Sequence, residues 1–299
     1  KKTARHVAVE KENIELIQLL LNTNNIDVNI KTYESFNEPR FVQYAEWCRE
    51  PVKYDKCLLS TEKTALYIAT EKNNLEIVKL FLNHKDTQVN TISYVRKPLS
   101  DELYNTERDI TTGKTALEVA VKNENNEIVQ QLLQHNNIDV NIKCFKFGIE
   151  YWQGYGGGND DLFIRKTVLH TAVKIENLDL VKLLLANDNI DVNAKYTFRR
   201  VRYDRHGASF DDFEKTALFI AVEKKNVNIV QLLLNNKKID INNAVFYDSY
   251  YCYELSGGNI DYIIRMNKRY LKEKFELNVI EDINEEEEDG FNEEEEDSF

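Results

Sequence analysis

The stretch KTVLHTAVKIENLDLVKLLLANDNIDVNAK, residues 166–195, decides the fold because similar blocks stand at four other places in the chain. These blocks occupy residues 2–31, 63–91, 114–143 and 215–243. Self-similarity of this kind is typical of repeat architectures, in which each unit buries its apolar face by stacking on its neighbours. We therefore expect one elongated solenoid and not a single globular core.

Within the quoted block, the apolar spacing predicts two short helices followed by an outward turn. Thr167 is a favourable N-cap, and Leu169 and Ala172 then fall on one helical face. Leucines and a valine between residues 178 and 185 predict the apolar face of a second helix, and the Asp-Val-Asn of residues 191–193 predicts the turn. On this pattern we expect Leu183→Ala to destabilise the fold by about 2–5 kcal/mol, the range for a truncated core leucine.

These residues resemble the ankyrin repeat. The family pattern T-P-L-H-x-A-A is similar to the TVLHTAV of residues 167–173, the leucine-rich second helix to LVKLLL of residues 180–185, and D-V-N to residues 191–193. The resemblance covers the five blocks, about half the chain. It implies an all-α dominated repeat solenoid: an ankyrin helix-turn-helix stack, here with long β-hairpin or irregular insertions between the repeats.

The turn between the two helices departs from the family pattern, which has a glycine there to adopt a left-handed backbone. The five blocks carry other residues at this place, each followed by an asparagine: Glu12-Asn13, Asn73-Asn74, Glu124-Asn125, Glu176-Asn177 and Lys225-Asn226. Asparagine tolerates the left-handed region and is also a strong N-cap. We therefore predict that the asparagine takes over the left-handed turn.

The segments between repeats are unusually long, and we call them fingers. Between the Asn of one D-V-N and the capping Thr of the next block lie 34, 24, 25 and 22 residues. Of the aromatic residues, only Tyr67, Phe81 and Phe219 lie inside the five blocks. The third finger (142–166) and the fourth (194–215) alternate like hairpin strands, with turns near residues 154–159 and 204–207. The first (30–63) is predicted to hold a helical turn after Pro39, and the second (91–114) receives no assignment.

The C-terminal part changes character. Residues 281–299 hold twelve acids and no bases, so the formal charge of −12 lies entirely there and the rest of the chain is neutral. Such a run repels itself, and we expect a disordered tail. Residues 1–280 are predicted to form the ankyrin array, with a capping segment at residues 244–280. We also hypothesise an intramolecular contact between the acidic tail and the basic fourth finger.

The sequence shows no catalytic or metal-binding pattern. The glycine-rich run at 154–158 lacks the Lys-Ser/Thr of a phosphate loop, and the four cysteines form no C-x-x-C pair. We predict no enzyme activity, no cofactor and no metal ion. The sequence contains no apolar run long enough for a membrane span and no signal peptide, and we expect an intracellular protein, cytoplasmic or nuclear.

The fourth finger interleaves bases with aromatic residues, which suits protein recognition and also stacking on nucleic acid. A third interpretation is a solvated hairpin edge or packing within the protein, because charged edge strands resist aggregation. The resemblance implies that partners contact the hairpin tips and two residues late in each first helix. We predict a protein-binding scaffold without membrane contact. A structural component of a larger assembly is the alternative, and nucleic-acid binding through the fourth finger is a weaker one. The predicted partner-binding residues are Trp47, Tyr151, Trp152, Lys174, Ile175, Tyr196, Phe198, Arg199, Arg200, Arg202 and Tyr203.

The resemblance also implies that the asparagine of D-V-N, at positions 29, 90, 141, 193 and 242, is a target of asparaginyl hydroxylation. The alternative is that this asparagine stabilises the hairpin. We favour the structural role, because asparagine side chains commonly satisfy nearby backbone groups in turns.

Overall fold

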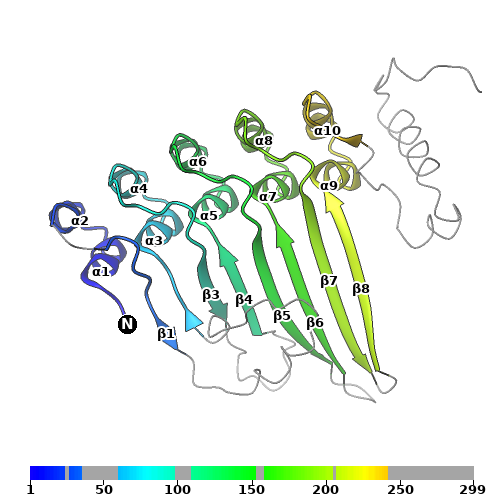
Figure 1. Ribbon diagram of the computed structural model, residues 1–299, viewed down its shortest axis with the longest axis horizontal. Coiled ribbons are helices and arrows are strands. Elements are labelled where there is room, and N and C mark those ends of the chain that lie inside the picture. The colour runs from blue at the N-terminus through cyan, green and yellow to red at the C-terminus, as the bar shows by residue number, and fades with distance from the viewer. Residues whose placement is uncertain (24–26, 36–59, 98–108, 153–157, 205–206, 242–299) are drawn as a thin grey trace, which may run out of the picture.

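Five helix pairs stand side by side in the computed structural model, which describes residues 1–23, 27–35, 60–97, 109–152, 158–204 and 207–241. The first helices of the pairs form one row and the second helices another (Figure 1). The first helices are α1 (Ala4–Glu10), α3 (Ala65–Glu71), α5 (Ala116–Lys122), α7 (Val168–Lys174) and α9 (Ala217–Glu223). The second are α2 (Ile14–Leu21), α4 (Leu75–Leu82), α6 (Asn126–Leu133), α8 (Leu178–Leu185) and α10 (Val227–Leu234). The predicted repeat stack is thus confirmed.

Each first helix begins after the threonine that the repeat pattern places there. The hydroxyl oxygens of Thr64, Thr115 and Thr216 each accept the backbone N–H three residues on, at 3.2 Å. At Thr167 the hydroxyl lies 2.8 Å from Nδ1 of His170, which also accepts the Thr167 backbone N–H. These contacts satisfy donors that a helix start otherwise leaves unpaired.

The turn between the helices differs from our prediction. The left-handed residue is the one at the family's glycine position, with φ from 54° to 62° at Glu12, Asn73, Glu124, Glu176 and Lys225. The asparagine that follows has an extended backbone and caps the second helix. In α8, for example, Oδ1 of Asn177 accepts the N–H of Leu180 at 3.1 Å. The prediction that asparagine takes over the left-handed turn is therefore wrong, and its capping role is confirmed.

A contact between repeats accounts for a non-glycine residue in this strained turn. The carboxylate of Glu124 accepts a hydrogen bond from Nδ2 of Asn177 at 2.9 Å, so Asn177 caps its own helix with one amide atom and contacts the preceding repeat with the other. Glu12 accepts from Asn74 in the same way, and Glu176 from Asn226. Glycine would remove the strain of a positive φ but has no side chain to bridge two repeats.

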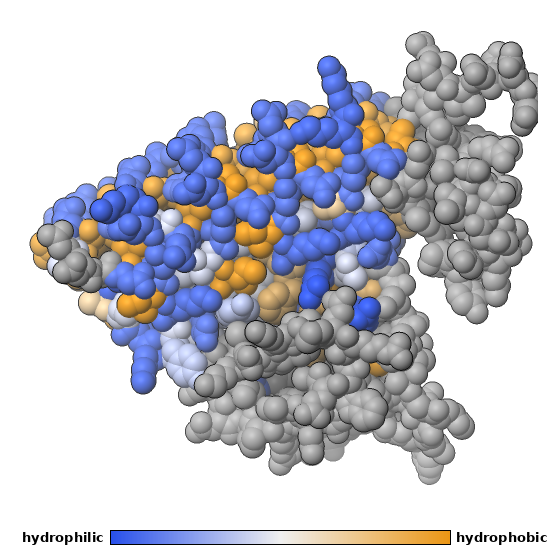
Figure 2. Space-filling view, viewed as in Figure 1, coloured by the Kyte–Doolittle hydropathy of each residue, from blue (hydrophilic) through white to orange (hydrophobic). Residues whose placement is uncertain are grey.

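The core lies between the two helix rows and continues through all five repeats. In α8, Leu180, Val181 and Leu184 are fully buried, whereas Leu183 is only partly buried at the edge of the core. The large loss of stability expected at Leu183 therefore belongs to Leu184, one residue further along the helix. Figure 2 shows that hydrophilic and apolar residues are interspersed over the face of the helix rows turned to the viewer.

The intervening segments form antiparallel hairpins, and three of them join into one sheet. A short pair, β1 (Glu34–Ser35) with β2 (Ser60–Thr61), lies in the first finger. The sheet runs in the order β3 (Ser93–Lys97), β4 (Asp109–Lys114), β5 (Cys144–Trp152), β6 (Gly158–Lys166), β7 (Lys195–Asp204) and β8 (Gly207–Thr216). It extends below the first-helix row (Figure 1). The third and fourth hairpins were expected; the helical turn after Pro39 lies outside the described residues.

Two features of the sheet were not anticipated. The second finger, left unassigned, forms the hairpin β3–β4, and neighbouring hairpins pair with one another through β4–β5 and β6–β7. Helical dominance is therefore not confirmed, because a six-stranded sheet accompanies the ten helices of the described residues. Gly113 makes room for this pairing: its partner in register is Phe145, and a Cβ at residue 113 would lie 2.2 Å from that ring.

The asparagines of D-V-N link each repeat to the next. Asn141 donates from Nδ2 to the backbone oxygen of Asn189 at 2.7 Å and accepts at Oδ1 from the N–H of Asp191 at 2.8 Å. Asn29, Asn90 and Asn193 make the same pair of bonds to the repeat that follows. The side chain thus pairs two backbone groups of the neighbouring turn, which is a structural role.

Asn141→Ala should lower the free energy of unfolding by about 1–3 kcal/mol, because two hydrogen bonds between repeats are lost and each contributes about 0.5–1.5 kcal/mol. Urea denaturation followed by circular dichroism measures the change. Asn136→Ala, at an exposed position in the turn that precedes it, is the control and should change stability by about 0.5 kcal/mol or less. Equal losses at the two positions would contradict a role for the Asn141 bridge.

Candidate functional site

A lysine stands immediately before the capping threonine in all five repeats, at positions 2, 63, 114, 166 and 215. Lys114 and Lys166 are the last residues of β4 and β6, and Lys215 is the last but one of β8. Because these strands lead directly into the first helices, the three lysines lie where the sheet meets the first-helix row (Figure 1).

In three repeats this lysine pairs with a glutamate eight residues further on, at the end of the first helix. The Nζ–Oε distances are 2.8 Å for Lys2–Glu10, 2.7 Å for Lys63–Glu71 and 2.9 Å for Lys215–Glu223. The pairs are partly exposed, so each contributes little to stability. In these three repeats the glutamate neutralises the charge of the lysine where the sheet meets the first helix.

Repeats three and four break the pattern, because lysines replace the glutamates at residues 122 and 174. Lys114, Lys122, Lys166 and Lys174 together are called the lysine cluster below. Within the described residues, only Lys166 of these four forms an ion pair. Of these four lysines only Lys174 was predicted from the sequence as a partner-binding residue. The signal for the cluster was that residues 122 and 174 depart from the Lys–Glu spacing of the other repeats.

Glu118 is the one acidic side chain that pairs with the cluster among the described residues. It lies on α5 and is buried, with 1% of its side chain exposed. Its carboxylate accepts from Nζ of Lys166 at 3.1 Å and from Oγ1 of Thr171 at 2.9 Å. Nζ of Lys166 also donates to Oγ1 of Thr171 at 2.7 Å. This network satisfies a buried charge and connects the first helices of repeats three and four.

The uneven charge perturbs the lysines. Burial, and then the proximity of Lys122, lowers the pKa of Lys114 to about 8. Burial also lowers the pKa of Lys174, and Lys166 adds to this effect. Both shifts have the sign expected when ammonium groups are partly desolvated beside other ammonium groups.

One face of the sheet continues this surface, and we call it the inner sheet face. Cys144 pairs in register with Lys166, and Tyr196 with Lys215, so these residues point to the same side. This side faces the first helices, because Cys144 Sγ lies 4.0 Å from Thr115 Oγ1 and the Tyr196 ring 6.1 Å from that of His170. Further from the helices, the inner sheet face carries Lys146, Ile164 and Phe198, which pair in register.

The predicted partner-binding residues fall into three groups. Trp47 lies outside the described residues, and the strands β5 and β7 contain Tyr151, Trp152, Arg200, Arg202 and Tyr203. Phe198 and Tyr196 lie on the inner sheet face, whereas Arg199 pairs in register with Phe163 on the opposite face. Lys174 is the last residue of α7 and lies at the protein surface, and Ile175 follows it as the C-cap and packs against the core.

Three bases of the fourth finger stand near acids of β8, whereas Arg202 pairs in register with Ser209. Arg199 and Arg200 pair in register with Asp212 and Asp211 of β8, and Lys195 forms an ion pair with Glu214 at 2.8 Å. The predicted basic character of this finger rested on β7 alone. The return strand β8 balances much of that charge, because opposite charges across an antiparallel pair attract each other.

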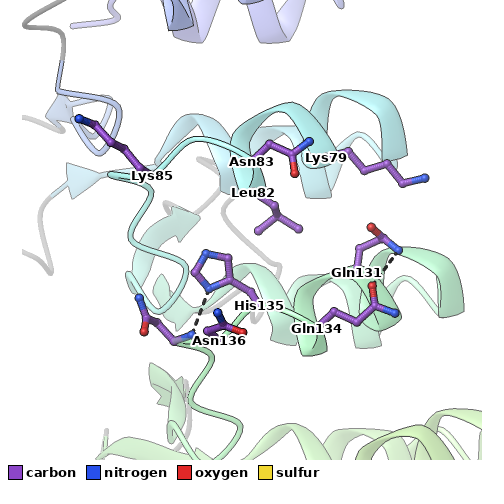
Figure 3. A pocket seen from close by; sticks show the side chains of 9 residues that line it. Lys79, Leu82, Asn83, Lys85, Gln131, Gln134, His135 and Asn136 are labelled. Carbon is purple, nitrogen blue, oxygen red and sulfur yellow. Dashed lines mark hydrogen bonds between the residues drawn. The ribbon is translucent and has the colours of Figure 1, made fainter.

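The hollow between α4 and α6 has a different composition (Figure 3). It has a volume of about 750 Å³ and is lined mainly by amides and cations, with Leu82 as an apolar member. Nδ1 of His135 accepts the backbone N–H of Asn137 at 3.2 Å, and His84 holds the equivalent turn at 3.3 Å. Small-molecule sites are usually lined mainly by apolar groups, and this hollow is not.

The described residues contain neither a metal centre nor a membrane-spanning helix. No group of three or more His, Cys, Asp or Glu side chains is placed to hold a metal ion. No helix there is long and apolar enough to cross a membrane.

The stacked helix pairs with hairpins at one edge define a repeat protein of the helix-turn-helix class. Comparison with protein families identifies it further: a model of ankyrin repeats in three copies matches residues 35–144 and 149–244, and a single ankyrin-repeat model matches residues 1–33. The chain belongs to the ankyrin-repeat family. No curated protein matches it.

Proposed function

We propose that this chain is a non-enzymatic scaffold that binds a partner protein on the surface formed by its first helices and the inner sheet face. Ankyrin repeats generally mediate protein–protein interaction and typically carry no catalytic activity, which supports this class of function. Ankyrin repeats are also common in intracellular proteins, and we infer the same location here.

The observation that carries the proposal is the continuity of the sheet with the first-helix row. Three hairpins join into one sheet, so the inner sheet face offers a single ordered surface instead of three separate loops. Ile164 and Phe198 lie next to each other on it and are partly exposed. A rigid aromatic side chain beside aliphatic and basic groups is typical of residues that contribute strongly to binding.

Phe198→Ala should abolish or strongly weaken capture of the partner, because it removes a partly exposed aromatic group from the inner sheet face. The intact chain is used to capture proteins from an extract, followed by mass spectrometry and titration of the protein retained. Phe163→Ala is the matched control, since Phe163 is also partly buried but lies on the opposite face of the neighbouring strand.

Retention of the partner by Phe198→Ala together with its loss by Phe163→Ala would place the interface on the other face of the sheet.

The contact of the acidic tail with the fourth finger stays a prediction. Deletion of residues 281–299 and measurement of partner affinity over a salt series would test it, because tail competition should fade as salt rises.

A further inference from the structure

We infer that the lysine cluster of repeats three and four binds a short acidic segment of a protein partner, of two or three Asp or Glu residues. This inference rests on the proposed scaffold function and names the chemistry of its partner. The cluster holds four lysines, and among the described residues Glu118 is the one acid that pairs with it. The neighbouring repeats are balanced by Lys63–Glu71 and Lys215–Glu223.

The cluster is costly in the free protein. Lys114 is partly buried next to Lys122, and a half-buried ammonium group beside other ammonium groups is unfavourable. The other repeats show that a glutamate fits at residue 122 or 174, because Glu10, Glu71 and Glu223 occupy the same place and pair with the lysine eight residues before. Repeats three and four thus carry an excess of positive charge at the place where the other repeats have a neutral Lys–Glu pair. An acidic group from a partner supplies the missing carboxylates.

The size of the cluster favours a short segment. Neighbouring helix axes lie about 8–10 Å apart, so two repeats offer a charged surface about 10 Å long. Three residues of an extended peptide cover this length at about 3.3 Å each. The buried carboxylate of Glu118 is held by Thr171 and Lys166, so incoming carboxylates meet chiefly Lys114, Lys122 and Lys174.

A protein segment fits this surface better than nucleic acid. The cluster is bordered on both sides by the carboxylates of Glu71 and Glu223, and Glu118 pairs with Lys166 within it. A nucleic acid needs a positive track along several phosphates, and these acids interrupt such a track. A peptide with acids confined to two or three positions places other residues over the flanking pairs.

The test uses the full chain and a fluorescein-labelled peptide with three consecutive glutamates, measured by fluorescence anisotropy at low salt. The double variant Lys122→Glu/Lys174→Glu restores the pattern of the other repeats, so we expect it to fold with unchanged or slightly higher stability. It should weaken peptide binding by about tenfold or more, which corresponds to about 1.4 kcal/mol. Lys79→Glu/Lys237→Glu makes the same change in net charge at exposed positions elsewhere and should weaken binding less than about threefold.

Each other outcome overturns the inference. Equal loss in the two double variants would mean that only net charge matters. Failure of the unmodified chain to bind the triglutamate peptide better than a triglutamine peptide would remove the site. Tighter binding of a single-stranded oligonucleotide, lost in the Lys122→Glu/Lys174→Glu variant, would assign the cluster to nucleic acid. None of these results bears on the capture experiment with Phe198→Ala, so the scaffold function is tested separately.

Proton loss gives a second readout. The groups that face Lys114 are Lys122, Lys166 and Glu118, and Lys114 is the member with a pKa of about 8. Affinity for the triglutamate peptide should therefore fall between pH 7 and pH 9 in the unmodified chain. A pH-independent affinity over this range would exclude Lys114 from the site.

Discussion

Leu184→Ala should lower the free energy of unfolding by about 2–5 kcal/mol, the range for a buried leucine cut back to alanine. The side chain of Leu184 is fully buried, and α8 packs against α6, α7 and α10 in the continuous core. The cavity would open in the middle of the array, where both neighbouring repeats depend on the contact. Chemical denaturation monitored by circular dichroism gives the value.

Leu183→Ala is the matched control for this experiment. It removes the same side-chain atoms from the neighbouring residue, which is only partly buried. We expect it to cost clearly less than Leu184→Ala. A larger loss at Leu183 would mean that the helix is rotated relative to the core and that its buried face is wrongly assigned.

Acidification should destabilise the protein through His170. This imidazole is buried, and burial lowers its pKa to about 4, from an ordinary value of about 6.5. Above pH 6.5 the histidine is neutral in both the folded and the unfolded chain. Between pH 6.5 and about 4 the unfolded chain takes up a proton that the folded chain does not, so stability falls as the pH falls. The full loss is about 3 kcal/mol, at about 1.4 kcal/mol per pH unit.

The measurement is the free energy of unfolding at pH 7 and at pH 4.5 for the unmodified chain and for His170→Gln. In the unmodified chain the backbone N–H of Thr167 donates to Nδ1 of His170. Glutamine at position 170 offers an oxygen to the same N–H. Unlike histidine, it cannot take up a proton. The variant should therefore be less sensitive to acid than the unmodified chain. His84→Gln, in the turn after α4, is the matched control. An unchanged acid sensitivity in His170→Gln would exclude this histidine as the source.

The helix pairs could be predicted because their signals are local. A capping threonine, apolar residues at helical spacing and the D-V-N turn act within one repeat, so the boundaries of α7 and α8 follow from residues 167–185. The choice between Leu183 and Leu184 could not be made in this way. Both lie in one apolar run, and the packing of α8 between α6 and α10 decides which leucine is buried.

The joined sheet and the lysine cluster depend on contacts between repeats. Each hairpin is visible by its own alternation, but pairing of β4 with β5 or β6 with β7 involves residues from different fingers, and no local pattern announces it. The left-handed turn shows the same limit. Intrinsic preference favours asparagine there, yet Glu124 and Glu176 adopt that conformation because the next repeat supplies a hydrogen bond to their side chains.

The pairing from β3 to β8 also affects how the protein responds to mechanical force. Hydrogen bonds in a sheet run perpendicular to the strands and therefore along the row of repeats. Tension along the row of repeats is opposed on the sheet side by backbone hydrogen bonds between neighbouring hairpins, and on the opposite side by the packing of α4, α6, α8 and α10. The sheet side of the array should therefore resist stretching more than the side of the second helices. Under load the array should bend by spreading its second helices while the strands keep their spacing.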